Sequence, residues 1–448
     1  MSNNKDVIVL GAGLVGSLLS IVLSKRGYNV TVYERRTDMR KENLHAGRSI
    51  NLALSDRGWR GLRIAGIEEE IKKVAIPMHG RTLHPVKGEI NYQPYGKEGQ
   101  YINSVSRGGL NCELMTLAEK HDVKINFGHR VNSVDLKSNT VFLEDLNGVK
   151  SEVQSELVFG SDGAYSASRL QLQFTELYNY SQSYLEHGYK ELTIEAGADG
   201  SFQLEKNVLH IWPRGGYMLI ALPNIDGTFT CTLFFPYKGN PSFEILQDEK
   251  SLVTFFNEIF PDVMPLMPNL VRDFFANPTG SLMTVRCFPW IFENKLMLIG
   301  DAAHAIVPFY GQGMNCGFED CAVLDGLIEK HNHDWNKIMP EYQQLRKPAA
   351  DGIAELAINN FIEMRDLVGQ PDFLLRKKIE ARFNGKYPND WMPLYSMVTF
   401  SEIPYHIALA EGKRQDKVME QVMAMPDIES KWDSEEAEHL ILKLNAAQ

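Results

Sequence analysis

The length, composition and charge of the chain exclude several classes of protein. Its 448 residues are more than one hydrophobic core normally organises, so two or three packed regions are expected. With 44% hydrophobic and 23% charged residues, the composition is that of a globular protein. The formal net charge of −11 argues against binding to nucleic acid or to an anionic membrane.

The cysteines and the apolar segments indicate the cellular compartment. There are five cysteines, an odd number, and no C-x-x-C spacing occurs, which argues against a disulfide framework or a structural zinc site. Residues 7–23 are apolar but contain three glycines, and the last 20 residues carry too much charge to span a bilayer. We therefore expect a cytoplasmic protein without a membrane span.

The chain begins with a strand, a glycine turn, a helix and a second strand. Residues 7–10 are wholly apolar, as in a buried parallel strand. Residues 14–25 predict a helix that Gly27 closes, and residues 30–33 predict the next strand. Together these elements predict a β-α-β unit.

The glycine turn of this unit matches the dinucleotide pattern G-x-G-x-x-G. Gly11 permits the tight turn, Gly13 lets the backbone approach a pyrophosphate, and Gly16 lets helix and strand pack closely. The helix N-terminus offers free N–H groups to the phosphates. Glu34, at the end of the second strand, would accept hydrogen bonds from a ribose and repel a 2′-phosphate, which disfavours NADP at this site. The pattern alone leaves FAD and NAD open.

The middle and the end of the chain have different patterns. Four β-rich runs separated by turn residues predict an antiparallel or mixed sheet, at residues 191–194, 208–212, 217–222 and 229–235. Residues 296–299 are again a short apolar strand, and from about Trp335 the chain is mainly helical in pattern. The sequence thus predicts a nucleotide-binding region, an inserted sheet, a return to the first region, and a helical tail.

Two further strand-to-turn segments carry acidic residues. Residues 158–166 run from an apolar strand into a turn that contains Asp162. Residues 298–304 do the same, and Asp301 in that turn is placed to accept a hydrogen bond from a ribityl hydroxyl. The glycine-rich residues 311–317 could open a helix whose N–H groups face a flavin or a pyrophosphate.

In their order and spacing, the glycine turn and the two acidic segments resemble the motifs of the single-component FAD aromatic hydroxylases. This family includes p-hydroxybenzoate hydroxylase; in it the first motif binds the ADP half of FAD, the second serves FAD and NADPH, and the third holds the ribityl chain. The resemblance implies an α/β fold: an FAD-binding Rossmann-like domain of the glutathione-reductase type, an inserted mixed β-sheet substrate domain and a C-terminal helical region. It divides the chain into an FAD-binding domain at 1–75, 100–180 and 285–345, a substrate domain at 76–99 and 181–284, and a helical region at 346–448.

Longer stretches resemble the branch of this family that hydroxylates L-kynurenine. They are residues 47–55, 104–107, 209–214, 300–320 and 360–365. The resemblance implies hydroxylation of L-kynurenine to 3-hydroxy-L-kynurenine through a flavin hydroperoxide. FAD would stay bound, NADPH would be a transient co-substrate, and O2 the oxidant; no second dinucleotide fingerprint occurs to hold NADPH permanently.

The same resemblance assigns the ligand-binding residues. Arg81 would hold the substrate carboxylate, since a guanidinium binds a carboxylate bidentately, whereas without the resemblance it would be taken for a surface arginine. Tyr95, Asn360 and Tyr395 would complete the polar contacts, and Tyr310 would line the pocket. The implied FAD contacts are Gly11, Gly13, Val15, Gly16, Tyr33, Glu34, Arg35, Arg36, Ala53, Arg107, Val131, Asp162, Asp301, Met314 and Asn315.

Other functions are compatible with parts of these patterns. An FAD hydroxylase of another aromatic acid would share the fold and the three cofactor motifs, and a flavin-binding regulator without catalysis would share the cofactor motifs. A halogenase would need a W-x-W-x-I-P segment, which the sequence lacks. Metal-binding and nucleophile motifs are also absent, so we predict no metal and no catalytic side chain, with the chemistry left to the flavin. His304 is interpreted as a turn histidine satisfied by backbone.

Overall fold

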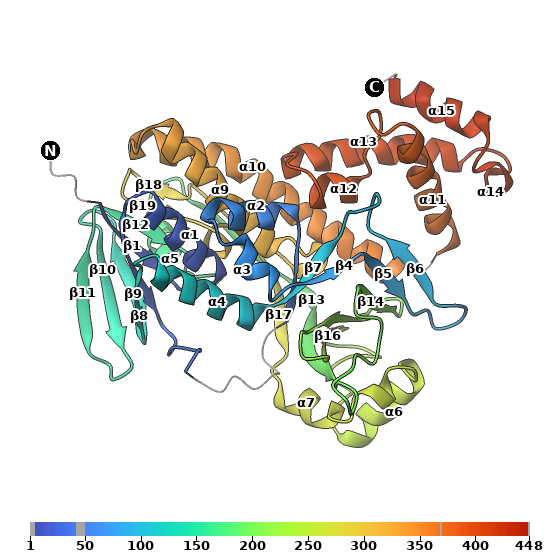
Figure 1. Cartoon of the computed structure of the whole chain (residues 1–448), viewed down its shortest axis with the longest axis horizontal. Coiled ribbons are helices and arrows are strands. Elements are labelled where there is room, and N and C mark those ends of the chain that lie inside the picture. The colour runs from blue at the N-terminus through green and yellow to red at the C-terminus, as the bar shows by residue number, and fades with distance from the viewer. Residues whose placement is uncertain (1–4, 42–49, 368–369, 447–448) are drawn as a thin grey trace.

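The computed structural model describes residues 5–41, 50–367 and 370–446, and a largely parallel sheet forms its first core (Figure 1). Six strands of the described chain make this sheet, in the order β18-β19-β12-β1-β2-β8. Their bounds are β1 (Asp6–Leu10), β2 (Asn29–Glu34), β8 (Lys124–Phe127), β12 (Leu157–Gly160), β18 (Ile291–Phe292) and β19 (Leu296–Leu298). β1 lies between β2 and β12 and is buried along residues 7–10, which explains why that run is wholly apolar.

Helices pack around this sheet. The first helix, α1 (Leu14–Lys25), contacts α2 (Asp56–Ala65), α4 (Arg107–Lys120) and α9 (Gly313–Lys330), and α3 (Glu68–Lys72) follows α2. The predicted β-α-β unit is therefore confirmed. An antiparallel sheet of β9 (His129–Asp135), β10 (Thr140–Asp145) and β11 (Lys150–Gln154) stands at the edge of the molecule and was not predicted; α5 (Ala167–Leu172) contacts β9.

The second sheet is mixed, as expected. In the described chain it has the order β17-β13-β16-β15-β14-β5-β6, and only the β14–β5 pair is parallel. Its strands are β5 (Gly80–Leu83), β6 (Asn91–Pro94), β13 (Asn179–Ile194), β14 (Val208–Pro213), β15 (Met218–Pro223), β16 (Phe229–Pro236) and β17 (Gly280–Phe288). The helices α6 (Glu249–Ile259) and α7 (Leu270–Ala276), with the short turn η1 (Met264–Leu266), connect β16 to β17.

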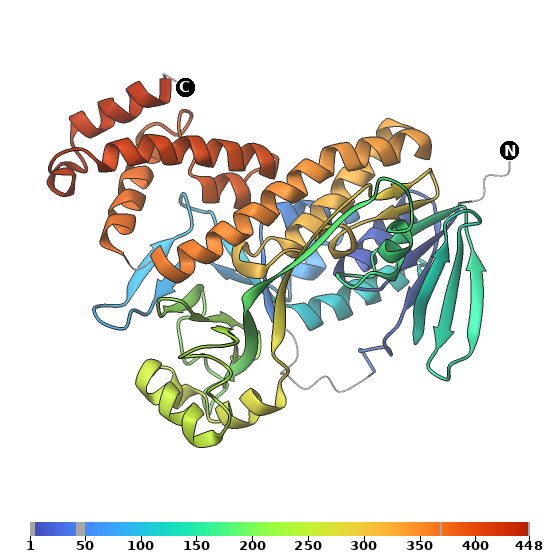
Figure 2. The same ribbon diagram turned by 180° about the vertical axis from the view of Figure 1, so that it is seen from behind.

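The strands β13 and β17 form a long ribbon that joins the two parts of the molecule (Figure 2). The 16 residues of β13 exceed the predicted run 191–194, because its first half is polar and exposed and shows no hydrophobic alternation. The predicted boundaries at 180/181 and 284/285 fall within these two strands, and the boundary at 345/346 falls within α10. The division into domains stays a prediction.

A small antiparallel sheet and the C-terminal helices complete the fold. The sheet has the order β3-β7-β4, with β3 (Asn51–Leu54), β4 (Ile76–Met78) and β7 (Ile102–Ser106). The remaining helices are α8 (Asp301–His304), η2 (Pro308–Tyr310), α10 (Trp335–Ile362), the π-helical turn η3 (Glu363–Leu367), α11 (Pro371–Lys386), α12 (Leu394–Thr399), α13 (Tyr405–Met423), α14 (Ile428–Lys431) and α15 (Glu435–Ala446). Within the described ranges, every helix is too short or too polar to cross a bilayer. Residues 47–49 of the stretch 47–55 lie outside the described residues.

Candidate active site

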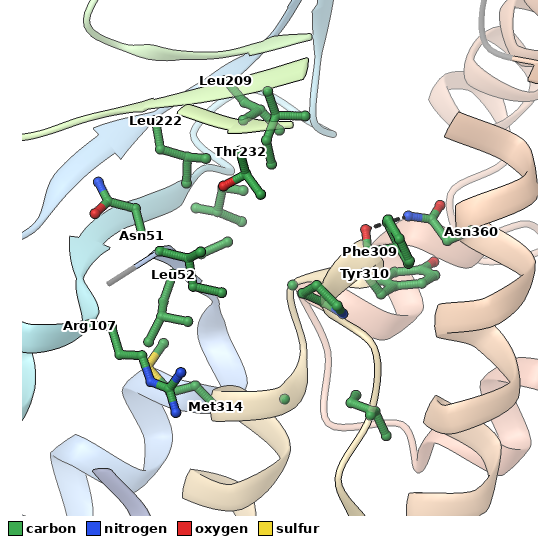
Figure 3. Close-up of a pocket in the computed structure, with 18 of the residues that line it drawn as sticks. Asn51, Leu52, Arg107, Leu209, Leu222, Thr232, Phe309, Tyr310, Met314 and Asn360 are labelled. Carbon is green, nitrogen blue, oxygen red and sulfur yellow. Dashed lines mark hydrogen bonds between the residues drawn. The ribbon is translucent and has the colours of Figure 1, made fainter. Parts of the chain in front are cut away.

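A cavity of about 290 Å³ extends from the glycine turn after β1 to the C-terminal helices. Its walls come from β3, the turns after β12 and β19, the start of α9, the strands β14 to β16, and from α10 and α12. Figure 3 shows Leu209, Leu222 and Thr232 on one side of the space and Phe309 and Tyr310 on the other. The end near α1 and α9 is called the flavin end below, and the end near β5 and α12 the substrate end.

The glycines of the first turn have distinct structural roles. Gly11 has φ +99°, and a Cβ there would lie 2.8 Å from the carbonyl oxygen of Ser161. A Cβ on Gly16 would lie 2.0 Å from the carbonyl oxygen of Gly11. A Cβ on Gly13 would meet nothing within 4 Å, and Gly13 lines the cavity. Backbone packing therefore requires two of the glycines, and the third leaves space for a ligand.

The flavin end combines features that suit a dinucleotide. The helices α1 and α9 begin after Gly13 and Gln312, neither of which caps its helix with a side chain, and the first residues of both helices line the cavity. Free N–H groups and the positive ends of the helix dipoles favour phosphate oxygens there. Asp301 also lines the cavity, and no described residue donates a hydrogen bond to its carboxylate. This donor and acceptor set fits FAD.

Glu34 fixes the end of β2 against the glycine turn. Its Oε2 accepts the N–H of Ala12 at 2.9 Å, and its Oε1 accepts the N–H and Nε of Arg36 at 3.0 and 2.8 Å. Burial by itself raises the pKa of Glu34, but the hydrogen bonds and charge of Arg36 and the Ala12 N–H outweigh it and lower that pKa. The carboxylate is therefore ionised at neutral pH.

The structure places the predicted cofactor residues in two groups. Those that line the cavity are Gly13, Val15, Ala53, Arg107, Asp301 and Met314. Those outside its lining are Gly11, Gly16, Tyr33, Glu34, Arg35, Arg36, Val131, Asp162 and Asn315. Val131 lies on β9 and packs against the first core. Contacts of both groups with FAD stay predictions.

Asp162 accepts hydrogen bonds from the residues at the start of α5. One oxygen of its carboxylate accepts the hydroxyls of Ser166 and Ser168 at 2.6 and 2.8 Å. The other accepts the N–H groups of Ala167 and Ser168 at 2.8 and 3.0 Å. Four donors thus turn this side chain toward the protein.

Asn315 has a similar structural role at the start of α9. Its Nδ2 donates to the carbonyl oxygens of Ala53 and Gly311 at 2.8 and 2.7 Å, and its Oδ1 accepts the N–H of Ser55 at 2.9 Å. The side chain therefore joins β3 to the turn before α9. It shapes the flavin end through the two main-chain segments that it connects.

The wall of the substrate end is an apolar sheet face. It consists of alternate residues of three neighbouring strands: Leu209, Ile211, Met218, Ile220, Leu222, Thr232 and Phe234. The sequence predicted these strands, but none of these residues was predicted to line a site. The alternation of strand side chains was the available signal, because residues two apart share a face.

Arg81 brings a positive charge into this apolar surrounding. It lies on β5, and its Nε donates to Oε1 of Gln93 on β6 at 2.9 Å. No described residue accepts a hydrogen bond from its two Nη groups, and the side chain lines the cavity. A half-buried guanidinium with two free donor groups is suited to bind a carboxylate.

Three tyrosines stack beside Arg81. The ring of Tyr395, on α12, lies 5.4 Å from that of Tyr95 and 5.8 Å from that of Tyr310, with interplanar angles of 11° and 16°. The hydroxyl of Tyr95 is buried and has no hydrogen-bond partner in the described chain. Burial raises the pKa of Tyr395 to about 12, although the charge of Arg81 opposes the shift, so its hydroxyl stays protonated at neutral pH.

Asn360 closes the substrate end from the last turns of α10. Its Nδ2 donates to the carbonyl oxygen of Phe309 at 2.7 Å, and the ring of Phe309 stacks on Phe361 at 4.2 Å. The π-helical turn η3 follows directly, and such turns occur frequently at functional sites. The structure therefore brings all four predicted substrate residues to one cavity, from separate parts of the chain.

The interpretation of His304 was wrong. Its Nε2 pairs with Oδ2 of Asp320 at 2.6 Å, and Oδ1 of Asp320 accepts Nε of Arg346 at 2.6 Å. Burial lowers the pKa of His304, but the charge of Asp320 outweighs burial and raises it. The partner lies on α9, 16 residues away, where no local pattern reveals it. Although Cys316 completes a group of three metal-ligating residue types here, the Arg346 charge opposes a cation.

Comparison with known proteins identifies the class. The FAD binding domain family matches residues 4–225 and 282–357. The solved structure of 2-methyl-3-hydroxypyridine-5-carboxylic acid oxygenase superposes with a TM-score of 0.67 at 17% identity, covering 83% of this chain and 95% of the other. Pseudomonas aeruginosa PqsL gives a TM-score of 0.63 at 18% identity, covering 81% and 96%. The fold and site define an FAD-dependent aromatic monooxygenase.

Relatives of higher sequence identity show which family within this class the chain belongs to. A kynurenine 3-monooxygenase of Flavobacterium johnsoniae is 51% identical over 445 residues, covering 99% of both chains. The Myxococcus xanthus enzyme of that name is 50% identical over 422 residues, covering 93% of this chain and 91% of the other. The Sus scrofa enzyme of that name is 43% identical over 417 residues, covering 92% and 88%. The chain belongs to the kynurenine 3-monooxygenase family.

Proposed function

We propose that this chain hydroxylates L-kynurenine to 3-hydroxy-L-kynurenine, with NADPH as reductant and O2 as oxidant. The observation that carries the proposal is the guanidinium of Arg81, whose free Nη groups lie in an apolar aromatic pocket continuous with the flavin end. Such a pocket suits an aromatic ring that bears an amino-acid carboxylate. The names of the full-length relatives support the same substrate.

The substrate end offers a partner to each part of kynurenine. The carboxylate would accept hydrogen bonds from the Nη groups of Arg81 and from the unpartnered hydroxyl of Tyr95. The aromatic ring would lie against the sheet wall, where Leu222 and Phe234 exclude water. Asn360 is held by its bond to the Phe309 carbonyl, which leaves its Oδ1 as an acceptor at the cavity.

The flavin end would hold FAD by main-chain and side-chain groups. The N–H groups at the starts of α1 and α9 would bind the pyrophosphate and the flavin ring, and Asp301 the ribityl chain. When bound, FAD supplies the redox chemistry and the activation of oxygen. The chain itself positions the substrate ring at a fixed place and keeps water from it. NADPH is proposed as a transient co-substrate.

The test is NADPH oxidation by the purified, FAD-loaded protein with and without L-kynurenine. NADPH consumed, 3-hydroxykynurenine formed and hydrogen peroxide released are measured together. We expect stimulated oxidation with nearly one hydroxylated product per NADPH. Stimulation that yields only peroxide would show that kynurenine is an effector and not the substrate. Oxidation that responds to phenolic acids and not to kynurenine would assign the chain to another aromatic hydroxylation.

A further inference from the structure

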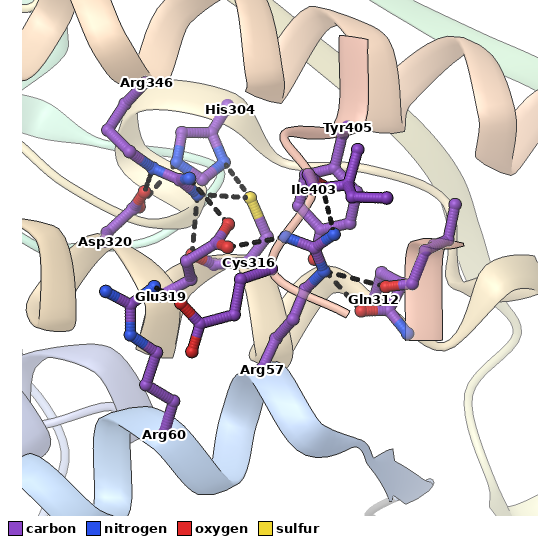
Figure 4. A network of polar contacts seen from close by, with 12 residues as sticks. Arg57, Arg60, His304, Gln312, Cys316, Glu319, Asp320, Arg346, Ile403 and Tyr405 are labelled. Carbon is purple, nitrogen blue, oxygen red and sulfur yellow. Dashed lines mark hydrogen bonds and ion pairs between the residues drawn. The ribbon is translucent and has the colours of Figure 1, made fainter. Parts of the chain in front are cut away.

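A buried chain of charged side chains links α2 to the flavin end (Figure 4). Nη1 of Arg57 donates to Oε1 of Glu319 at 2.6 Å, and Oε2 of Glu319 accepts Nη1 of Arg346 at 2.6 Å. Nε of Arg346 donates to Asp320 at 2.6 Å, and Asp320 also accepts the N–H of Gly300 at 3.1 Å. These four side chains are at most 5% exposed, so each charge depends on its neighbours for compensation.

Arg57, at one end of this network of charged side chains, binds the C-terminal region. Nε of Arg57 donates to the carbonyl oxygen of Val398 at 2.7 Å, and its Nη2 donates to the carbonyl oxygens of Met397, at 3.1 Å, and Ile403. Its Cζ lies 4.1 Å from the centre of the Tyr405 ring. Two of these carbonyls belong to the last turn of α12, where carbonyls lack intrahelical partners and a positive charge is favourable. Arg57 therefore caps the C-terminus of α12.

The helix that Arg57 caps carries a wall of the substrate end. Tyr395 lies on the first turn of α12, and its ring is stacked between Tyr95 and Tyr310. α12 has only six residues, so its position depends on tertiary contacts: its buried side chains pack against α13, and its two ends make further contacts. The stack holds one end and Arg57 holds the other.

We propose that Arg57 is a positioning residue for the substrate end. By capping α12 it keeps Tyr395 in the tyrosine stack, without touching substrate or cofactor itself. Replacing the guanidinium fork loosens α12 and weakens kynurenine binding, while FAD stays bound. The link to kynurenine rests on the proposed function; the capping of α12 does not.

Arg57→Lys tests the role, because lysine keeps the charge near Glu319 but cannot reach three carbonyls at once. Arg60→Lys is the matched control: Arg60 is on the same helix, and its Nη1 pairs with Glu402 at 3.2 Å on the surface. The FAD-loaded full chains are compared by hydrogen exchange of residues 394–405 without substrate, and by the dissociation constant of L-kynurenine from flavin absorbance. We expect faster exchange and about tenfold weaker binding for Arg57→Lys alone.

A second pair of variants tests whether the effect passes through Tyr395. Tyr395→Leu is made alone and together with Arg57→Lys, and the loss of kynurenine affinity in the double variant should be smaller than the product of the single losses. A loss in the double variant that equals the product of the two single losses would overturn the route through Tyr395. If Arg57→Lys does not fold, Tyr405→Leu removes the ring over the guanidinium and should change both measurements in the same direction.

The capping of α12 and the positioning of the substrate end can be overturned separately. Unchanged exchange in residues 394–405 of Arg57→Lys overturns the capping role, whatever the substrate. Faster exchange with unchanged kynurenine affinity overturns the positioning of the substrate end. A wild-type chain whose flavin spectrum does not respond to kynurenine overturns the proposed function, and with it the link to this substrate.

Discussion

The two ends of the cavity are built in opposite ways. The flavin end is formed mainly by main chain: a glycine turn, the N-termini of α1 and α9, and the turn at Asp301. The substrate end is formed by side chains that come from β5, the sheet wall, α10 and α12. A site made of main chain depends on particular residues within a short stretch of sequence. A site made of side chains depends on the fold to bring together elements that are distant in the sequence. Variants that displace main chain at the flavin end should therefore disturb fold and cofactor together, whereas side-chain variants at the substrate end should act mainly on ligand affinity.

The largest effect is expected at Gly16. Gly16→Ala would place a Cβ 2.0 Å from the carbonyl oxygen of Gly11, and the main chain must move to admit it. We expect a loss of about 3 kcal/mol or more in the free energy of unfolding, with little FAD bound. Thermal unfolding and FAD content measure both.

Gly13→Ala is the matched comparison. Its Cβ would meet no atom of the described chain within 4 Å, so the fold should be intact. The added methyl group occupies cavity space, and we expect FAD affinity to fall about tenfold at an unchanged Tm. Equal Tm losses for the two alanine variants would contradict the separate roles given to these glycines.

The next largest effect is a loss of FAD affinity in Glu34→Gln. An amide presents an NH2 group to either the Ala12 N–H or the Arg36 side chain, so one of the present hydrogen bonds is lost. We expect FAD affinity about tenfold lower and kynurenine affinity of the loaded enzyme unchanged. Flavin fluorescence during reconstitution of the apoprotein measures the first.

The same carboxylate gives a pH dependence of stability. The pKa of Glu34 is lowered in the folded chain, so its stabilisation is present above the unfolded-state pKa and is lost as pH falls through the folded value. The Tm difference between wild type and Glu34→Gln should therefore shrink below about pH 4. A difference that grows in acid would reverse the sign and contradict the assignment.

At the substrate end, Tyr95→Phe should have two effects of opposite sign. The hydroxyl is buried without a partner, so its removal should stabilise the free chain by about 1 kcal/mol. If that hydroxyl binds the substrate carboxylate, kynurenine affinity should fall about fivefold. Unfolding of the substrate-free protein and titration with kynurenine separate the two. A variant with weaker binding and lower stability would point to general damage of the pocket.

The smallest effects on FAD are expected at two predicted contacts outside the cavity lining. Asp162→Ala removes the acceptor of two N–H groups at the start of α5 and should cost about 1–2 kcal/mol of stability. Val131→Ala removes packing against the first core and should cost about 1 kcal/mol. FAD affinity should stay within about twofold in both, since four donors of the protein hold the Asp162 carboxylate and Val131 packs against the first core. A loss like that of Glu34→Gln would support both residues as direct cofactor contacts, as the sequence predicted.

The sequence predicted the regions whose signals are local. The β-α-β unit, the strands that return to the first sheet and the mixed inserted sheet all follow hydrophobic patterns, and the fold family followed from three ordered motifs. The first half of β13 was missed because it is polar, and the sheet of β9 to β11 because its patterns are weak. The partner of His304 and the cap that Arg57 forms on α12 join distant positions, which no local pattern reveals.

Arg81 is expected to bind the carboxylate of kynurenine at the substrate end. The most direct measurement is a cycle of four dissociation constants: wild type and Arg81→Ala, each with L-kynurenine and with kynuramine, which lacks the carboxylate. We predict that wild type binds kynurenine about 100-fold more tightly than kynuramine, and that Arg81→Ala loses this difference while it keeps its FAD. An Arg81→Ala variant that still prefers kynurenine by the same factor would contradict the account.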